Sequence, residues 1–241
     1  MNVRDRKQEI RERVWALLAT TGSVVSDPHG RIPNFASAAA AAARLAVTSQ
    51  WRAARVIKCN PDQAQEPVRA QTLRDGKQLY MAVPALTETR PFFHVNPILG
   101  NHAPEDAATS AVAAAHAPLV DLEAMGHIDL VVSGCTAVNG AGARLGKGAG
   151  YADIEMGLLV EAGLVDDATV LATTVHDLQV LDIVDLPEEP HDFRLDLIVT
   201  PSQVIACPRA QRPGGINWAL LPPEKVAAIP ALAARQPQAG S

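Results

Sequence analysis

Side chains capable of chemistry are concentrated in one glycine-rich stretch, residues 140–155, which reads GAGARLGKGAGYADIE. Two cations, Arg144 and Lys147, lie between its glycines, and an aromatic residue and two carboxylates follow them. Glycine allows backbone N–H groups to approach an anion closely, while arginine offers a planar fork of donors and lysine a point charge. This combination predicts a loop that binds phosphate groups.

The spacing of these glycines differs from two common phosphate-binding motifs. Gly142 and Gly146 are separated by three residues instead of the four of a Walker A loop, and Lys147 precedes Gly148 rather than Ser or Thr. The series Gly146-x-Gly148-x-Gly150 also departs from the dinucleotide fingerprint. Glycines alone would equally fit a turn that passes close to a neighbouring segment. The charged and aromatic neighbours favour phosphate binding.

A second group of cations lies on an amphipathic helix predicted over residues 4–19. Its apolar side chains share one face: Ile10, Val14, Leu17 and Leu18. Lys7 and Arg11 are four residues apart and therefore project from the same side of the helix. Such a pair either forms a solvated basic face or reaches phosphates, and periodicity alone favours the solvated face.

The elements around the glycine-rich stretch predict an α/β fold. An apolar run at 128–133 precedes the stretch and a helix follows it, so it lies between a strand and a helix start. Residues 55–83 predict a strand, a helix and a second strand, which form a parallel unit. Further strands are predicted at 168–175 and 195–199. The alternation predicts a three-layer, doubly wound, mostly parallel sheet of Rossmann-like type.

Strand ends supply the remaining candidates. Ligands of open parallel sheets bind at the carboxyl ends of the strands, which makes the turn Asn60-Pro61-Asp62 a candidate site. His176-Asp177 and His191-Asp192 also lie beside predicted strands, but such pairs are more often structural hydrogen bonds than a metal set. Ser133 and Ser202 lack the context of a nucleophile elbow, so covalent catalysis is not expected.

Composition limits the classes of partner. The chain has 241 residues and a formal net charge of −5, which argues against a nucleic-acid partner. Cys59, Cys135 and Cys207 are widely spaced, which indicates a reducing compartment and argues against a zinc site. No apolar run has the length of a membrane span. We therefore expect a cytoplasmic protein with no membrane partner, in which residues 1–205 form one domain and residues 206–241 a Pro- and Ala-rich extension.

Residues 144–153, Arg-Leu-Gly-Lys-Gly-Ala-Gly-Tyr-Ala-Asp, resemble the signature Arg-Leu-Gly-x-Gly-x-Gly-Tyr-Tyr-Asp of the 5-formyltetrahydrofolate cyclo-ligase family, the methenyltetrahydrofolate synthetases. The second Tyr of the signature is Ala152 here. Lys7-x-x-Ile10-Arg11 is similar to the N-terminal Lys-x-x-Leu-Arg of the family, and residues 191–201 are similar to its closing segment. Four stretches resemble the divergent branch called methenyltetrahydrofolate synthetase domain-containing proteins: 31–35, 60–62, 148–155 and 174–180.

The resemblance implies magnesium- and ATP-dependent conversion of 5-formyltetrahydrofolate, a reduced folate, to 5,10-methenyltetrahydrofolate. It implies catalytic roles for Arg144 and Lys147, and Mg²⁺ binding by Asp153 and Asp196. Asp62 and Tyr151 would contact the substrate. The implied ATP-binding residues are Lys7, Arg11, Arg144, Leu145, Gly146, Lys147, Gly148, Gly150 and Tyr151.

Two departures from the family pattern lie on the substrate side. Asp62 stands where the family has Glu, and Ala152 replaces a large aromatic wall. These departures keep two alternatives open. One is an ATP-dependent enzyme of the same fold that acts on another N-formyl or amide heterocycle, for example in thiamin or other cofactor salvage. The other is a non-catalytic module that binds a nucleotide or a folate.

Overall fold

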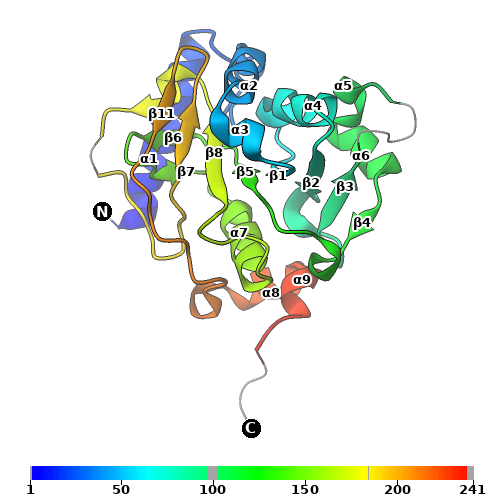
Figure 1. The fold of residues 1–241 in the computed structure, drawn as a ribbon. Helices are drawn as coiled ribbons and strands as arrows, with labels where there is room; N and C mark the ends of the chain where they lie inside the picture. Colours follow the sequence, from blue (N-terminus) through cyan, green and yellow to red (C-terminus); the bar gives the residue numbers. More distant parts are fainter. Residues whose placement is uncertain (1, 97–101, 184, 238–241) are drawn as a thin grey trace.

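The computed structural model describes residues 2–96, 102–183 and 185–237 (Figure 1). Within these residues the central sheet has eight strands in the order β11-β10-β8-β5-β1-β2-β3-β4. Its middle strands run parallel: β1 (Val56–Cys59), β2 (Gln78–Ala82), β5 (Leu130–Val132), β8 (Val170–Thr174) and β10 (Leu197–Val199). The predicted mostly parallel sheet is confirmed.

The edges of the sheet are antiparallel. β3 (Phe92–Val95) pairs with β2, β4 (Leu119–Val120) pairs with β3, and β11 (Val204–Ala206) pairs with β10. Sequence patterns predicted none of these strands, because prolines interrupt the stretch around β3 and β4 and each edge strand is short.

Helices cover both faces of the sheet, as Figure 1 shows. One face carries α2 (Ala38–Ala46), α3 (Ser49–Ala53), α4 (Glu66–Arg74), α5 (Pro104–Ala107) and α6 (Ser110–His116). The opposite face carries α7 (Tyr151–Glu161), α8 (Pro223–Ala228) and α9 (Pro230–Ala233). Alternate strand residues face opposite layers, so Ile57 and Cys59 pack under α4 while Lys58 points toward α7.

A small sheet beside the main one holds the start of the glycine-rich stretch. β6 (Ala137–Asn139) forms a hairpin with β7 (Arg144–Leu145) and pairs in parallel with β9 (Val180–Leu181). Helix α1 (Val3–Thr20) packs Val14 and Leu18 against this sheet. Because Arg144 and Leu145 belong to a strand, the loop proper begins at Gly146. The described residues also contain short 3₁₀ turns: η1 (Gln63–Gln65), η2 (Pro84–Leu86), η4 (Leu122–Ala124), η5 (Asp177–Gln179) and η6 (Trp218–Leu220).

The C-terminal segment shares the core of the domain. Val226, Ile229 and Leu232 are buried with residues of α7 and of the sheet. The predicted boundary at residue 205 falls inside β11. Residues 226–232 therefore contribute to the core of the domain.

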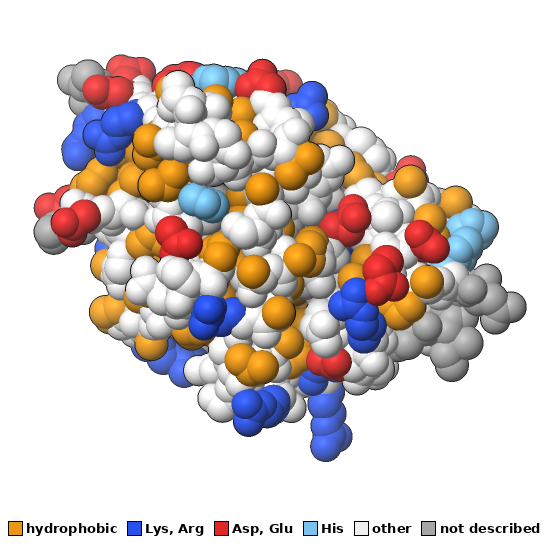
Figure 2. Space-filling view, turned by 90° about the horizontal axis from the view of Figure 1, so that it is seen from above, with side chains coloured by type: hydrophobic (Ala, Val, Ile, Leu, Met, Phe, Trp, Pro, Cys, Tyr) orange, Lys and Arg blue, Asp and Glu red, His pale blue; other side chains and the backbone are white. Residues whose placement is uncertain are grey.

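The surface and the helices add two observations. On the face shown in Figure 2, acidic, basic and apolar side chains are interspersed, and the basic ones do not gather into one patch. In the described part of the chain no helix has the length and apolar character to span a membrane.

Candidate active site

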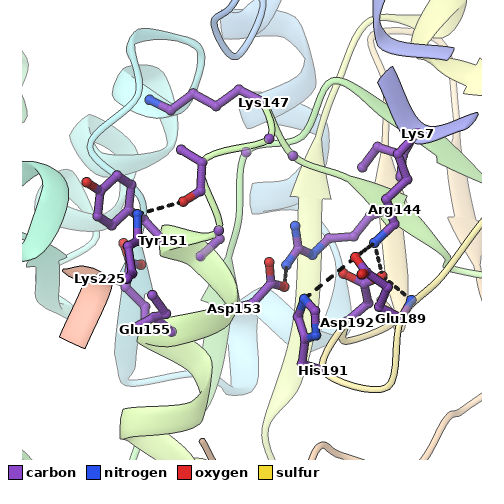
Figure 3. Close-up of a pocket in the computed structure, with 18 of the residues that line it drawn as sticks. Lys7, Arg144, Lys147, Tyr151, Asp153, Glu155, Glu189, His191, Asp192 and Lys225 are labelled. Carbon is purple, nitrogen blue, oxygen red and sulfur yellow. Dashed lines mark hydrogen bonds and ion pairs between the residues drawn. The ribbon is translucent and has the colours of Figure 1, made fainter. Parts of the chain in front are cut away.

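A cavity of about 860 Å³ opens at the carboxyl ends of β1 and β5. The chain runs from β1 to β2 on one side and later returns to β5 on the other, so the strand order reverses between β1 and β5. Open α/β sheets bind ligands at this switch point. Residues 60–62 follow β1, Gly134 follows β5, and both border the cavity. Arg11 and loop 146–150 border it as well. Figure 3 shows Lys7 and Lys147 at this cavity.

Loop 146–150 joins β7 to the first turn of α7. Gly150 takes φ +73° at the N-cap of α7, and Gly148 takes φ +98°. These positive φ angles favour glycine at both positions, and Gly148 lies beside the guanidinium of Arg11. The N-terminus of α7 therefore points its unpaired N–H groups and partial positive charge at the cavity. Leu145 precedes the loop and is buried against Val14.

Arg144 is held rigidly at the cavity wall. Its guanidinium forms an ion pair with Asp153 and lies 3.7 Å from the ring centre of Phe193. The residue is 3% exposed, and its Nε finds no hydrogen-bond partner among the described residues. A buried guanidinium with a spare donor is suited to an anionic ligand.

Lys7 and Arg11 are buried, so the solvated basic face favoured by periodicity is wrong. Lys7 Nζ donates to Glu189 Oε2 at 2.9 Å and to Asp192 Oδ2 at 2.5 Å. Arg11 Nε donates to the Gly146 carbonyl at 2.7 Å. Helical periodicity shows that the two cations project from the same side of the helix. It does not show which residues pack against that side.

Lys147 and Tyr151 lie on the other side of the loop. Figure 3 shows Lys147 extended away from the ion pairs of Lys7 and Arg144. Its ammonium is exposed and has no hydrogen bond to a described residue, and its charge acts on Asp62. The Tyr151 ring borders the cavity beneath Lys225, whose Nζ is 3.6 Å from the ring centre.

Asp62 is half-buried in the turn after β1. Buried Arg69 fixes this turn by donating to the carbonyls of Asn60 at 2.5 Å and of Asp62 at 3.0 Å. Burial raises the pKa of the Asp62 carboxyl, and the charge of Lys147 partly opposes this shift. Asp62 borders the cavity, at the strand end where the rule for open parallel sheets places ligands.

Because folding raises the pKa of Asp62, this carboxyl makes the folded state less stable at high pH than at low pH. An acid whose pKa is raised by folding favours the folded state while protonated, and this contribution is lost as pH rises through the raised pKa. We therefore expect Asp62→Asn to have a thermal midpoint a few degrees above the parent at pH 7, with the two converging near pH 4. Asp166 has a pKa lowered by its bond from the Ala168 N–H, so Asp166→Asn should be less stable than the parent at pH 7. An Asp62→Asn midpoint below that of the parent would contradict this account.

The prediction that Asp153 and Asp196 share a metal ion requires correction. Asp196 precedes β10 at the amino end of the sheet, where it binds Arg212 and accepts the Leu171 N–H at 2.8 Å. Asp129 plays the same part before β5, where it accepts the Arg55 and Val56 N–H groups. An aspartate directly before a parallel strand thus lies opposite the ligand-binding edge.

Asp192 is a carboxylate at the cavity that the sequence analysis did not assign to a ligand site. It borders the cavity, binds Lys7, and acts electrostatically on Asp153. The motif His191-Asp192 was noticed but interpreted as structural. The structure shows such hydrogen bonds at both pairs: Asp192 accepts the Glu189 N–H at 2.7 Å, while His176 caps η5 and Asp177 accepts the Thr200 hydroxyl.

Two further groups near the cavity had no clear sequence signal. Lys58 and Glu155 form a buried ion pair between β1 and α7, and Lys225 reaches the loop from the C-terminal segment.

The thiols of Cys59 and Cys135 are buried, which raises the pKa of each to about 11. Both are therefore protonated at neutral pH.

Comparison with curated proteins gives relatives over almost the whole chain. The methenyltetrahydrofolate synthase domain-containing protein of Mus musculus is 39% identical and matches 97% of this chain and 65% of its own length. The Homo sapiens protein of the same name is 36% identical over 97% of this chain and 63% of its own. The 5-formyltetrahydrofolate cyclo-ligase of Mycolicibacterium smegmatis is 34% identical over 38% of this chain and 43% of its own. The chain thus spans just under two thirds of the mouse and human relatives.

A solved structure and a family model agree with these relatives. The NMR structure of Aquifex aeolicus 5,10-methenyltetrahydrofolate synthetase matches 85% of this chain and 94% of its own, with a TM-score of 0.53 and 16% identity, which shows a shared fold. The model of the 5-formyltetrahydrofolate cyclo-ligase family matches residues 3–201. This range includes the cations of α1, the turn after β1, the glycine-rich loop and Asp192. The chain therefore belongs to the 5-formyltetrahydrofolate cyclo-ligase family.

Proposed function

We propose that this chain catalyses the ATP-dependent closure of 5-formyltetrahydrofolate to 5,10-methenyltetrahydrofolate. The observation that carries the proposal is the convergence of Lys7, Arg11 and Arg144 beside loop 146–150 and the N-terminus of α7. Buried cations next to a helix N-terminus provide the charge that a triphosphate requires. Membership of the cyclo-ligase family and the names of the relatives support the reaction type.

In the proposed reaction the formyl oxygen attacks the γ-phosphorus of ATP and ADP leaves. N10 then attacks the activated formyl carbon, loses its proton and displaces phosphate. Phosphoryl transfer needs little covalent chemistry from the enzyme, so positioning and charge neutralisation dominate. Arg144 is assigned to the transition state because Asp153 and Phe193 hold it in place before the ligand binds. Lys147, the exposed cation of the loop, is assigned to the transferred phosphate.

Mg²⁺ is the metal implied by this reaction, and the cavity offers oxygen donors that fit it. Asp153 and Asp192 both border the cavity. Burial raises the pKa of Asp153, and the charge of Asp192 acts in the same direction. Mg²⁺ binds through one or two carboxylates and completes its shell with phosphate oxygens and water. Asp153 and Asp192 would therefore hold Mg²⁺, which would neutralise charge on the phosphates of ATP.

The proposed Mg²⁺ site includes Asp192 but not Asp196, which is four residues further along the chain. We expect Asp192→Asn to raise the Mg²⁺ concentration for half-maximal activity by about 10-fold or more, because one of two ligands is lost. Asp196→Asn is the control, since Asp196 lies at the opposite end of the sheet beside Arg212. A magnesium titration at saturating ATP measures both. An equal response of the two variants would contradict the assignment.

A second candidate reaction keeps the nucleotide and changes the other substrate. Asp62 and Ala152 both border the cavity and depart from the family pattern, which favours another N-formyl or amide heterocycle, as in thiamin or other cofactor salvage. The shorter carboxylate and the missing ring change the reach and the shape of this side of the cavity. The phosphate side is the same in both candidates.

The test uses the purified chain with Mg-ATP and 5-formyltetrahydrofolate. ADP release and the near-ultraviolet absorbance of the methenyl product are followed together, and equal amounts of both are expected. ADP release with another heterocycle but not with formylfolate would favour the second candidate. Calorimetry that shows tight binding of nucleotide or folate without turnover on any substrate would instead indicate a non-catalytic module.

A further inference from the structure

Residues 215–225, here called the C-terminal wall, close one side of the cavity. Ile216, Leu220, Leu221 and Lys225 of this wall border it. The wall lies beyond residue 201, where the match to the family model ends. The alignment with the mouse relative extends over 97% of the chain and therefore includes part of the wall.

The wall is docked onto α7 by close packing. A Cβ atom at Gly157, in the middle of α7, would lie 2.5 Å from Ile216 Cδ1 and 3.1 Å from the Ile216 nitrogen. Glycine inside a helix costs about 1 kcal/mol relative to alanine, and here its missing side chain admits the wall. Glu161 Oε1 accepts the Ile216 N–H at 2.9 Å. The helix that begins at the glycine-rich loop thus also fixes the C-terminal wall.

Lys225 links the wall to the loop. The residue lies on α8, where its neighbour Val226 is 6% exposed and anchors the helix in the core. Lys225 Nζ donates to the Ala149 carbonyl at 2.9 Å and lies 3.6 Å from the centre of the Tyr151 ring (Figure 3). The cation–π contact restrains the Tyr151 ring, and the hydrogen bond restrains the Ala149 carbonyl.

We propose that Lys225 is a positioning residue for nucleotide binding, which fixes the Ala149–Gly150 peptide and the Tyr151 ring. This inference rests on the proposed function, because it takes the ligand of loop 146–150 to be the phosphates of a nucleotide. The peptide unit is planar and trans, so an anchored Ala149 carbonyl directs the Gly150 N–H to the opposite side. No described residue accepts a bond from that N–H. The N–H is thereby held available to a phosphate oxygen.

The test compares Lys225→Met with a matched lysine far from the cavity. Lys77 makes the same kinds of contact: it donates to the Trp51 and Ala54 carbonyls at 3.0 and 2.6 Å and lies 5.7 Å from a Trp51 ring centre. Calorimetry with Mg-ATP gives the Kd of each variant, and steady-state kinetics give separate KM values for ATP and formylfolate. Lys225→Met should weaken ATP binding about 10-fold or more, with a similar rise in KM for ATP alone. Lys225→Arg should restore most of the affinity, and Lys77→Met should bind ATP as the parent does.

The outcomes separate the two proposals. A parent that binds no nucleotide would overturn the proposed function and this inference with it. A parent that binds ATP and a folded Lys225→Met variant that binds it equally well would overturn this inference alone. Equal rises in the KM for both substrates would also overturn it, since they would indicate a general structural role. Circular dichroism and the thermal midpoint establish that each variant is folded.

Discussion

Replacing Arg144 with alanine is expected to lower kcat/KM for the proposed ATP-dependent reaction by about 1,000-fold or more, the magnitude of a removed arginine in phosphoryl transfer. Arg144 is buried, paired with Asp153 and stacked on Phe193, so its charge is fixed before the phosphates arrive. Steady-state ADP release measures the effect. The reaction should remain slow at saturating ATP, because the proposed role of Arg144 lies in the transition state as well as in binding.

Stability is the alternative explanation for such a loss, and the chain offers a matched control. Arg144 and Asp153 have side chains 2% and 16% exposed, while Arg212 and Asp196 form an equivalent pair that is 6% and 17% exposed. Removing either arginine leaves a partly buried carboxylate without its partner and should destabilise the fold by roughly 3 kcal/mol. Arg212→Ala should therefore unfold as easily as Arg144→Ala while its kcat/KM stays within a few-fold of the parent.

Comparing the activities of Arg144→Ala and Arg212→Ala can contradict the catalytic assignment of Arg144. If Arg144→Ala and Arg212→Ala lose activity in proportion to their stability, Arg144 acts through folding and the catalytic assignment is wrong. Assays run below the unfolding transitions of both variants make this distinction. A large loss confined to Arg144→Ala supports the assignment.

The parallel centre of the fold was predictable because its signals are local. Residues 55–83 show an apolar strand, a helix closed by a glycine and a second strand, and the structure contains β1, α4 and β2 there. The hairpin of β6 and β7 was not predicted, because strands of two or three residues show no alternation. Their pairing is a long-range property of the small sheet against α1.

The position of a residue relative to the cavity could be predicted where it depends on the direction of a strand. It could not be predicted where it depends on tertiary contacts with residues distant in sequence. Asp62 follows β1 and faces the cavity as expected. Asp196 precedes β10, so the same rule would have excluded it from the ligand-binding edge. Asp192 lies outside regular structure, and only its tertiary contact with Lys7 reveals its place. Lys7 itself was recognised as a cation on a helix, but its burial depends on Glu189 and Asp192, which are distant in sequence.

The packing of the C-terminal segment also depends on tertiary contacts that the sequence does not reveal. Its proline and alanine content predicted a peripheral extension. Val226, Ile229 and Leu232 nevertheless recur at three-residue intervals and are buried together. The apolar spacing was visible in the sequence, but the surface that receives it, on α7 and the sheet, was not.

The buried pair between Lys58 and Glu155 is where we expect the largest change in stability. Lys58 is 2% exposed and Glu155 is 4% exposed, and Lys58 Nζ also donates to Asn60 Oδ1 at 2.7 Å. Lys58→Met leaves the Glu155 carboxylate buried without its cation, which should lower the free energy of unfolding by about 3–5 kcal/mol. Urea denaturation at pH 8 measures the change. Arg74→Met, which removes one member of an exposed pair with Glu105, is the control and should change stability little.

The pH dependence distinguishes a buried charge from lost packing. Burial raises the pKa of Glu155 and Lys58 opposes the shift, so Lys58→Met should raise that pKa further. A raised carboxyl pKa favours the folded state at low pH, and this contribution is lost as pH rises through it. The cost of Lys58→Met should therefore shrink toward pH 5. Replacing Glu155 with methionine as well should recover most of the stability at pH 8, because two apolar side chains then fill the space without a charge. A cost that is independent of pH and persists in the double variant would mean that Lys58 stabilises the fold through its packing rather than through its charge.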